Sequence, residues 1–186
     1  MTIAATEPPD ALVRARRGDE AAFEELMRVH ERQVLLTSFR LLGRLEDAQD
    51  AAQETFLKLY RNLRVFGSIA EIRPWLYRVT VNVCHDLARK RGLLAVEENR
   101  LELAVEDGGD ARIDLAQQRE LLAEALTFLP EKERAAIVLR DIEGLDTDEV
   151  AGILGSSAAT VRTQVSTGRA RLRGIVARLM RRKHGR

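Results

Sequence analysis

The stretch 146–173, DTDEVAGILGSSAATVRTQVSTGRARLR, decides the fold because it predicts two helices joined by a tight turn. Asp146 can cap the first helix, and Glu149, three residues later, completes the spacing of a capping box. Gly155 can adopt the left-handed conformation that ends a helix. One of the two serines that follow it can then cap the second helix.

The second of these helices has two faces of opposite character. Aliphatic residues and a glycine share the inner face: Val161, Val165, Gly168 and Leu172. Basic, hydroxyl and amide side chains share the rest: Arg162, Thr163, Gln164, Ser166, Thr167, Arg169 and Arg173. A short helix, a glycine turn and a helix with a basic outer face indicate a DNA-binding helix-turn-helix. The alternative is a helical hairpin with an ordinary solvated face.

Composition favours an all-α protein without a metal or disulfide framework. Strong helix formers dominate the 186 residues, and no run of β-branched residues alternates as a strand would. The single cysteine, Cys84, excludes an internal disulfide and a cysteine-rich zinc site. The first residues do not read as a signal peptide, and no apolar run reaches membrane-spanning length. We therefore expect a cytoplasmic protein with no membrane insertion of its own.

The net charge of +1 conceals an uneven distribution. No acidic residue follows Val150, whereas the same segment holds many basic residues, among them Arg171, Arg178 and Arg181. A near-neutral total with one strongly basic end indicates a local nucleic-acid contact surface.

The N-terminal part predicts further helices over 10–17, 20–42 and 45–63. On the third, acidic and amide side chains gather in one sector: Asp47, Asp50, Gln53 and Glu54. By spacing alone this patch is equally consistent with solvated surface and with a docking face for a basic partner. His30 lies on the inner stripe of the second helix, where we expect a core histidine instead of a metal ligand.

A non-helical connector over 65–72 precedes a helix that opens at Arg73-Pro74. This helix is apolar on most sides and carries one narrow polar stripe: Arg78, Asn82, His85 and Arg89, followed by Lys90 and Arg91. Such a stripe suits contact with a nucleic-acid backbone. Among the aromatic residues, Phe66 in the connector is the fair candidate for stacking on an unpaired base.

An acidic segment interrupted by Gly108-Gly109 separates the two halves of the chain. The fold expected is all-α, with two small helical domains joined by a flexible acidic linker. The predicted boundaries are 10–92 for the first domain, 93–112 for the linker and 113–178 for a four-helix domain with the helix-turn-helix. No phosphate-cradling glycine loop, metal cluster or catalytic triad is visible, so we expect neither an enzyme nor a cofactor.

The ordered set of segments resembles the bacterial RNA polymerase sigma factors of the two-domain extracytoplasmic-function group. The matching segments of the first domain are GDEAAFEEL, EDAQDAAQETFLKLYRNL and RPWLYRVTVNVCHDLARKR. Those of the second are LPEKERAAIVLRDIEGL and DEVAGILGSSAATVRTQVSTGRARL. The resemblance covers nearly the whole chain, from about residue 10 to 176.

This resemblance implies roles for three groups of residues. The patch of Asp47, Asp50, Gln53 and Glu54 would dock on the coiled coil of the polymerase β′ subunit. The −10 promoter element would be held by Phe66, Gly67, Ser68, Arg73, Arg78, Asn82, Arg89, Lys90 and Arg91. The −35 element would be read by Arg162, Thr163, Gln164, Ser166, Thr167, Arg169, Arg171 and Arg173. The implied partners are core RNA polymerase (β′ coiled coil and β flap), promoter DNA and an anti-sigma factor.

Two positions depart from the family pattern. Gln164 and Thr167 stand where many relatives carry arginine, which removes phosphate contacts and lowers the salt sensitivity of binding. We therefore expect an uncommon −35 preference. The alternative function is a LuxR-type helix-turn-helix regulator, whose DNA-binding domain would resemble 129–172 but which would need an upstream sensor domain. A sigma-like decoy that only sequesters an anti-sigma factor is a third hypothesis, against which the intact basic helix and patch count.

Overall fold

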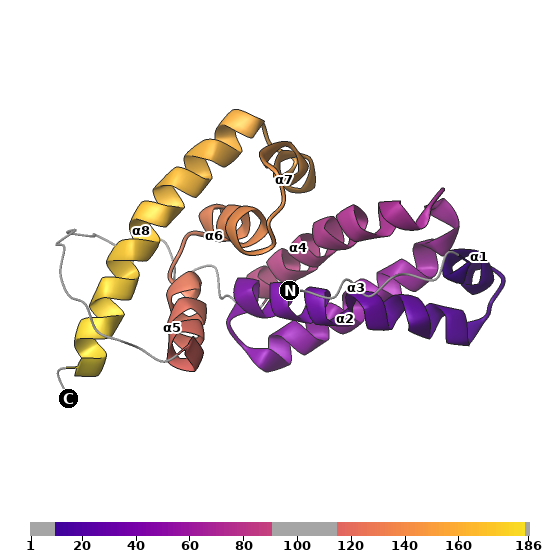
Figure 1. Cartoon of the computed structure of the whole chain (residues 1–186), viewed down its shortest axis with the longest axis horizontal. Helices are drawn as coiled ribbons and strands as arrows, with labels where there is room; N and C mark the ends of the chain where they lie inside the picture. Colours follow the sequence, from indigo (N-terminus) through magenta and orange to yellow (C-terminus); the bar gives the residue numbers. More distant parts are fainter. Residues whose placement is uncertain (1–9, 91–114, 185–186) are drawn as a thin grey trace.

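The structure, a computed structural model, describes residues 10–90 and 115–184, and within these ranges all regular elements are helical (Figure 1). The all-α expectation is confirmed. Residues 91–92 and the predicted linker 93–112 lie outside the described residues, as do 113 and 114, so the exact domain boundaries stay predictions.

The N-terminal part contains four α-helices and two short 3₁₀ turns. The bounds are α1 Ala11–Arg16, α2 Glu20–Leu42, α3 Leu45–Asn62, η1 Leu63–Val65, η2 Ile69–Glu71 and α4 Ile72–Lys90. The predicted α2 is confirmed at both ends, and Gly43 terminates it with a left-handed φ of 76°. The connector is more ordered than we expected, since two 3₁₀ turns bracket it and α4 begins two residues before Pro74.

The C-terminal part contains α5 Leu115–Thr127, α6 Glu131–Ile137, the π-helical turn η3 Val138–Ile142, α7 Thr147–Leu154 and α8 Ala158–His184. The predicted capping box of α7 is present, because the Asp146 carboxylate accepts from the Glu149 amide at 2.8 Å and Glu149 accepts from the Asp146 amide at 2.8 Å. Gly155 then ends α7 at φ 60°. The four helices predicted for this domain are present, but the sequence gave no sign of the π turn that continues α6.

Helices α1 to α4 enclose an N-terminal core. Its largest fully buried members are Leu26, Leu59, Ile72 and Leu76. His30 is 3% exposed on the inner side of α2, as a core histidine would be. Within the described residues no group of three His, Cys, Asp or Glu side chains could hold a metal ion.

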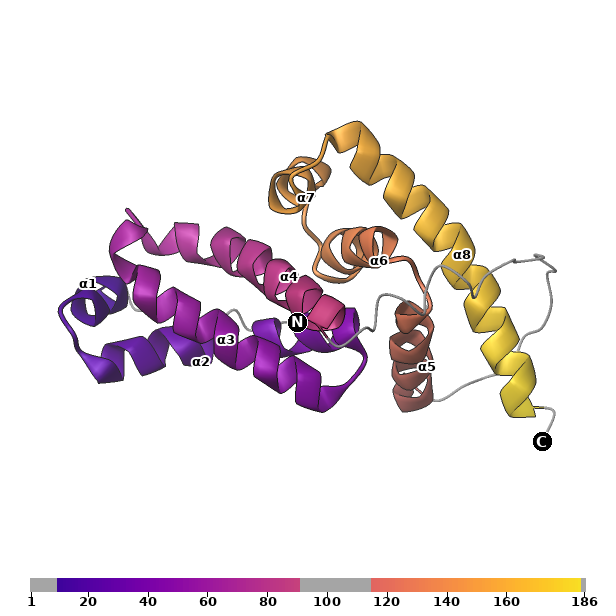
Figure 2. The same cartoon turned by 180° about the vertical axis from the view of Figure 1, so that it is seen from behind.

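A second core joins the two halves of the molecule. Leu41, Leu42, Val83 and Cys84 of the N-terminal part pack with buried residues of α5, α6, η3 and α8, among them Leu126, Val138 and Ile175. Figures 1 and 2 show α5, α6 and α7 facing α2 and α4, with α8 on the far side of α5 and α6. The sequence predicted two domains but gave no sign that they would share a core.

Arg134 of α6 forms the deepest polar contact at this junction. Its side chain is 6% exposed, and burial lowers its pKa to about 10. It donates to the Leu41 carbonyl of α2 at 2.6 Å and to the Thr127 and Leu129 carbonyls at 2.9 and 2.8 Å. Carbonyls in the last turn of a helix have no partner within it, so Arg134 satisfies the ends of α2 and α5 together.

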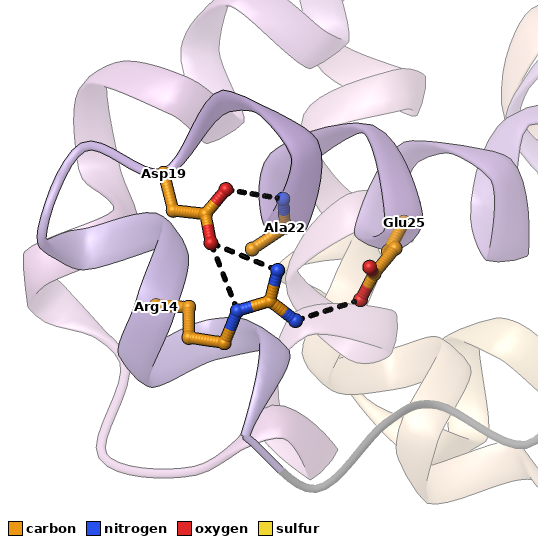
Figure 3. A network of polar contacts seen from close by, with 4 residues as sticks. All are labelled: Arg14, Asp19, Ala22 and Glu25. Atoms are coloured by element: carbon orange, nitrogen blue, oxygen red, sulfur yellow. Dashed lines mark hydrogen bonds and ion pairs between the residues drawn. The ribbon is translucent and has the colours of Figure 1, made fainter.

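A polar network fixes the angle between α1 and α2 (Figure 3). Asp19 caps α2 by accepting from the Ala22 amide at 3.1 Å, and it also accepts from Arg14 at 2.8 Å. A further ion pair of 3.4 Å joins Arg14 to Glu25. The Ala22 amide and the Arg14 guanidinium lower the pKa of Asp19 below its usual value.

We predict that Asp19→Asn reduces the dependence of stability on pH. Because the folded pKa of Asp19 is depressed, its contribution is present above about pH 4 and is lost as the pH falls through the folded pKa. Asparagine still caps a helix but carries no charge. Thermal unfolding at about pH 7 and about pH 3 should show a smaller difference in the variant than in the wild type. An unchanged difference would mean that Asp19 contributes only as a cap.

Candidate nucleic-acid interface

The apolar face of α8 is buried, and the predicted recognition face on the other side of the helix is therefore exposed. Val161 and Val165 are buried in a core with Val150 and Ile153 of α7. Ser157 caps α8 by accepting from the Thr160 amide at 3.1 Å. The predicted helix-turn-helix is therefore present, with both helices held by one core.

Exposure on α8 follows the predicted outer face with two exceptions. The exposed side chains are Arg162, Thr163, Ser166, Thr167, Arg169 and Arg173, whereas Gln164 and Arg171 are half-buried. Thr163 donates to the Ala159 carbonyl at 3.1 Å and Thr167 to the Thr163 carbonyl at 2.9 Å. Their hydroxyl protons are thus used within α8, which leaves their oxygens as acceptors for an outside donor.

Two of the predicted −35 arginines are tied to acidic residues of the same half. Arg169 makes a bidentate pair with Asp141 of η3, at 2.7 and 2.6 Å, and this contact raises the pKa of Arg169. Arg171 lies 3.1 Å from Glu133 of α6. Arg162 and Arg173 have no ion pair within the described residues. Their charges are the ones most available to a phosphate or a base edge.

Helix α4 exposes the predicted basic stripe. Arg78, Asn82, Arg89 and Lys90 are exposed, while Leu76, Tyr77 and Cys84 on its other sides are buried. Arg89 pairs with Asp86 at 3.2 Å. Arg73 lies over the Tyr77 ring, with its guanidinium carbon 5.8 Å from the ring centroid. Arg91 lies outside the described residues.

In the connector, the environment of Phe66 differs from the one that the sequence predicted. Phe66 is 3% exposed and packs edge-on against Trp75, with ring centroids 5.3 Å apart. In this arrangement Phe66 is a core residue and offers no face for base stacking. Gly67 and Ser68 are exposed, and Glu71 accepts from the Gly67 amide at 3.0 Å and from the Ser68 hydroxyl at 3.2 Å.

Glu71 thus holds the connector in place, a role that the sequence did not predict. The S-x-x-E spacing of Ser68 and Glu71, which is that of a capping box, was a signal that could have found it. Glu143, whose contacts reach residues 66 to 106 positions away, left no such signal.

The predicted docking patch on α3 is only partly accessible. Asp50 and Gln53 are exposed and Glu54 is half-buried, with its carboxylate 3.7 Å from Lys58. Asp47 is 0% exposed, so its carboxylate is not on the surface of this patch. Two apolar side chains, Leu57 and Tyr60, also belong to the exposed face of α3, since they are 44% and 52% exposed. The accessible patch therefore combines acidic, amide and apolar groups.

Comparisons with known proteins identify the family of the chain. Residues 26–93 match Sigma-70 region 2, and residues 119–172 match Sigma-70, region 4. The chain is 36% identical over 180 residues to the ECF RNA polymerase sigma factor SigE of Mycolicibacterium smegmatis, which covers 92% of this chain and 69% of that protein. The chain belongs to the ECF RNA polymerase sigma factors. It is a promoter-recognising subunit, and nothing supports the LuxR-type alternative.

Further relatives support the same membership for this sigma factor. It is 31% identical over 170 residues to the ECF RNA polymerase sigma factor SigW of Bacillus subtilis, which covers 85% of this chain and 90% of that protein. Two solved structures share its fold. CnrH in complex with the cytosolic domain of CnrY has a TM-score of 0.67 at 24% identity, covering 92% of this chain and 98% of that one.

The second solved structure is the sigma factor RpoE in complex with the anti-sigma factor NepR from Bartonella quintana. Its TM-score is 0.65 at 22% identity, covering 83% of this chain and 96% of that one. At these identities both structures support the fold alone. Within the described residues no helix of this sigma factor is long and apolar enough to cross a membrane.

We predict that Glu71→Ala loosens the connector without unfolding α4. The Gly67 amide and the Ser68 hydroxyl would lose their common acceptor, while the buried Phe66 and Ile72 would still anchor the two ends. Hydrogen exchange should then be faster at the Gly67 amide and unchanged in the middle of α4. In Glu71→Gln, which keeps one acceptor oxygen, exchange at the Gly67 amide should be faster than in the wild type and slower than in Glu71→Ala. Unchanged exchange at Gly67 would contradict the role assigned to Glu71.

Proposed function

We propose that this sigma factor uses three separate surfaces during initiation. The accessible patch on α3 docks on the β′ coiled coil of core polymerase, and the second domain contacts the β flap. The connector and the stripe on α4 hold the −10 element, while the outer face of α8 reads the −35 element. The supporting observation is that α4 and α8 each bury their apolar sides and leave a basic face exposed.

The chemistry of the two DNA faces differs. The outer face of α8 offers hydroxyls and arginines on a helix of major-groove dimensions, which suits the base edges and phosphates of duplex DNA. The stripe on α4 adjoins a preformed connector, which suits a strand whose bases have left the stack. Capture of such bases offsets the cost of unstacking, about a few kcal/mol per base. Promoter melting therefore needs no hydrolytic site, and we propose that the protein itself is not an enzyme.

Because Phe66 and Asp47 are buried, fewer residues form the proposed −10 surface and the proposed docking surface. With Phe66 in the core, the exposed backbone and side chains at Gly67 and Ser68 are the groups of the connector that a base can reach. Docking rests on Asp50, Gln53 and Glu54, with Leu57 and Tyr60 beside them. Asp47 would support the patch from within α3.

The domain limits, the cellular location and one partner complete the proposal. We place the two domains at residues 10–92 and 113–178, joined by 93–112. Core polymerase and promoter DNA are in the cytoplasm, where this subunit would act. The family resemblance also supports an anti-sigma factor as a partner.

Run-off transcription with purified core polymerase on genomic fragments tests this function. Addition of the protein should produce transcripts that start at discrete promoters. Core polymerase alone serves as the control. The proposal is overturned if no promoter-dependent transcript appears while the protein alone binds duplex DNA tightly, since that is the behaviour of a conventional regulator.

We predict that Asp50→Ala with Glu54→Ala weakens binding to core polymerase and leaves the fold intact, because both side chains belong to the accessible patch and not to the core. Co-purification with core polymerase and circular dichroism measure the two effects. Glu20→Ala with Glu31→Ala, which removes two exposed carboxylates from α2, is the matched control. Equal co-purification of both double variants would count against docking through α3.

We predict that Arg162→Ala weakens binding to the preferred −35 duplex by about 1–3 kcal/mol, the usual range for a bidentate base contact. Arg169→Ala should cost less, because Asp141 already holds that guanidinium. Affinity for a panel of −35 sequences at fixed salt measures both. An equal loss for Arg162→Ala on every sequence would make Arg162 a phosphate contact and not a base contact.

A further inference from the structure

Two arginines of α8 are paired with carboxylates that α8 itself does not supply. No acidic residue follows Val150 in the sequence, so both carboxylates come from earlier elements. Asp141 of η3 accepts from Nε and Nη2 of Arg169 at 2.7 and 2.6 Å. An oxygen of Glu133 in α6 lies 3.1 Å from Nε of Arg171. The fold of the C-terminal domain, and not α8 alone, therefore sets the net charge of this helix.

Gly168 lets α8 come close enough to α6 for these pairs to form. The residue is buried where α6 packs on α8 (Figures 1 and 2). A Cβ atom at position 168 would lie 2.8 Å from Cδ1 of Ile137 and 3.2 Å from Cβ of Glu133. Both distances are shorter than the usual separation of carbon atoms in contact, about 3.5–4.0 Å. Glycine is unfavourable in the middle of a helix, so the close approach is what this glycine provides.

The paired arginines remain at the surface of the domain. The Arg169 and Arg171 side chains are 56% and 41% exposed, whereas those of Asp141 and Glu133 are 24% and 14% exposed. The guanidiniums thus reach solvent beside the outer face of α8, while the carboxylates that hold them are more enclosed. Half of the four positive charges predicted for the −35 element are offset in this way.

Offsetting these charges changes how the helix binds DNA. A cation that neutralises a phosphate releases counterions and adds affinity for every sequence, with a salt dependence of about −0.9 in log K per log salt. An arginine paired with a carboxylate keeps N–H groups that can donate, but the pair has no net charge. A carboxylate close to the DNA also repels phosphates. Both effects lower the part of the affinity that does not depend on sequence.

The two pairs share this loss of net charge and little else. Arg169 is held by two contacts on a carboxylate of the π turn, whereas Arg171 is held through Nε by a carboxylate of α6. A device that only aimed one guanidinium at a base would need a single geometry. Two geometries with the same electrostatic result favour a role in charge.

We propose that Asp141 and Glu133 limit the sequence-independent affinity of α8 for duplex DNA by offsetting the charges of Arg169 and Arg171. Recognition of a −35 element then depends more on the base contacts of unpaired side chains such as Arg162. The consequence at promoters rests on the proposed function, while the charge balance rests on the contacts alone.

Fluorescence anisotropy of the full-length protein with a labelled duplex of unrelated sequence tests this role. Asp141→Asn keeps the shape of the side chain and one acceptor oxygen but removes the charge. The variant should bind more tightly than the wild type, with a slope of log K against log salt steeper by about 0.9. Its gain over the wild type should therefore be about threefold larger at about 50 mM than at about 200 mM salt. Glu133→Gln should change the affinity and the slope in the same direction.

Two control variants separate the pairs from net charge in general. Glu124→Gln removes one charge from an exposed position of α5 and should leave the slope unchanged. Arg169→Gln combined with Asp141→Asn should lose most of the gain, because the released guanidinium is then absent. Circular dichroism of each variant monitors the fold.

Several outcomes would overturn the proposal. It fails if Asp141→Asn and Glu133→Gln both bind the unrelated duplex as the wild type does, or if Glu124→Gln gains as much. A loss of affinity by Asp141→Asn confined to the −35 duplex of a mapped promoter would mean that Asp141 orients Arg169 for base reading. Unfolding of both pair variants would make the pairs structural. The measurement uses no polymerase, so its failure is distinct from failure of the run-off assay.

Discussion

The buried guanidinium of Arg134 is the contact on which the packing of the two domains depends. It lies where the C-terminal ends of α2 and α5 meet, and it donates to carbonyls of both. The last turn of a helix carries unpaired carbonyls and the negative end of the helix dipole, so a fixed positive charge between two such ends is favourable. A pKa of about 10 keeps Arg134 charged at neutral pH despite its burial.

The segment that carries Arg134 organises both faces of the C-terminal domain. Along α6 and η3, Arg134 and Glu143 turn toward the N-terminal domain, whereas Glu133 and Asp141 turn toward the arginines of α8. One short stretch of chain therefore sets the position of the recognition helix and the closure of the domains. The π turn brings Asp141 to Arg169 and Glu143 to Arg40 within three residues of each other. A change in the junction would thus alter the positions of the arginines that we propose contact DNA.

The helices could be predicted from the sequence, whereas the contacts between the two domains could not, and the reason is physical. Caps and glycine turns are local, so Asp146 and Gly155 predicted their helix ends correctly. Helical periodicity likewise predicted the inner seam of α8 at Val161 and Val165. The contacts of Arg134 and Glu143 join residues of different domains, and no local spacing encodes them.

Local sequence patterns also could not predict which side chains are exposed. Phe66 sits in a glycine-containing connector, and its composition indicated an exposed ring. The ring is buried because Trp75, nine positions later, turns back over it. Asp47 shares a sector with Asp50 on the helical wheel, yet it lies at the start of α3 where packing encloses it. A wheel assigns direction around a helix but not what covers each turn.

The central claim is that the exposed basic faces of α4 and α8 are the surfaces through which this sigma factor contacts promoter DNA. The most direct measurement is run-off transcription by core polymerase with one face altered at a time, through Arg78→Ala on α4 and Arg162→Ala on α8. The account predicts that each variant lowers promoter-dependent transcription, whereas Glu20→Ala with Glu31→Ala leaves it unchanged. Wild-type transcription with both arginine variants would contradict it.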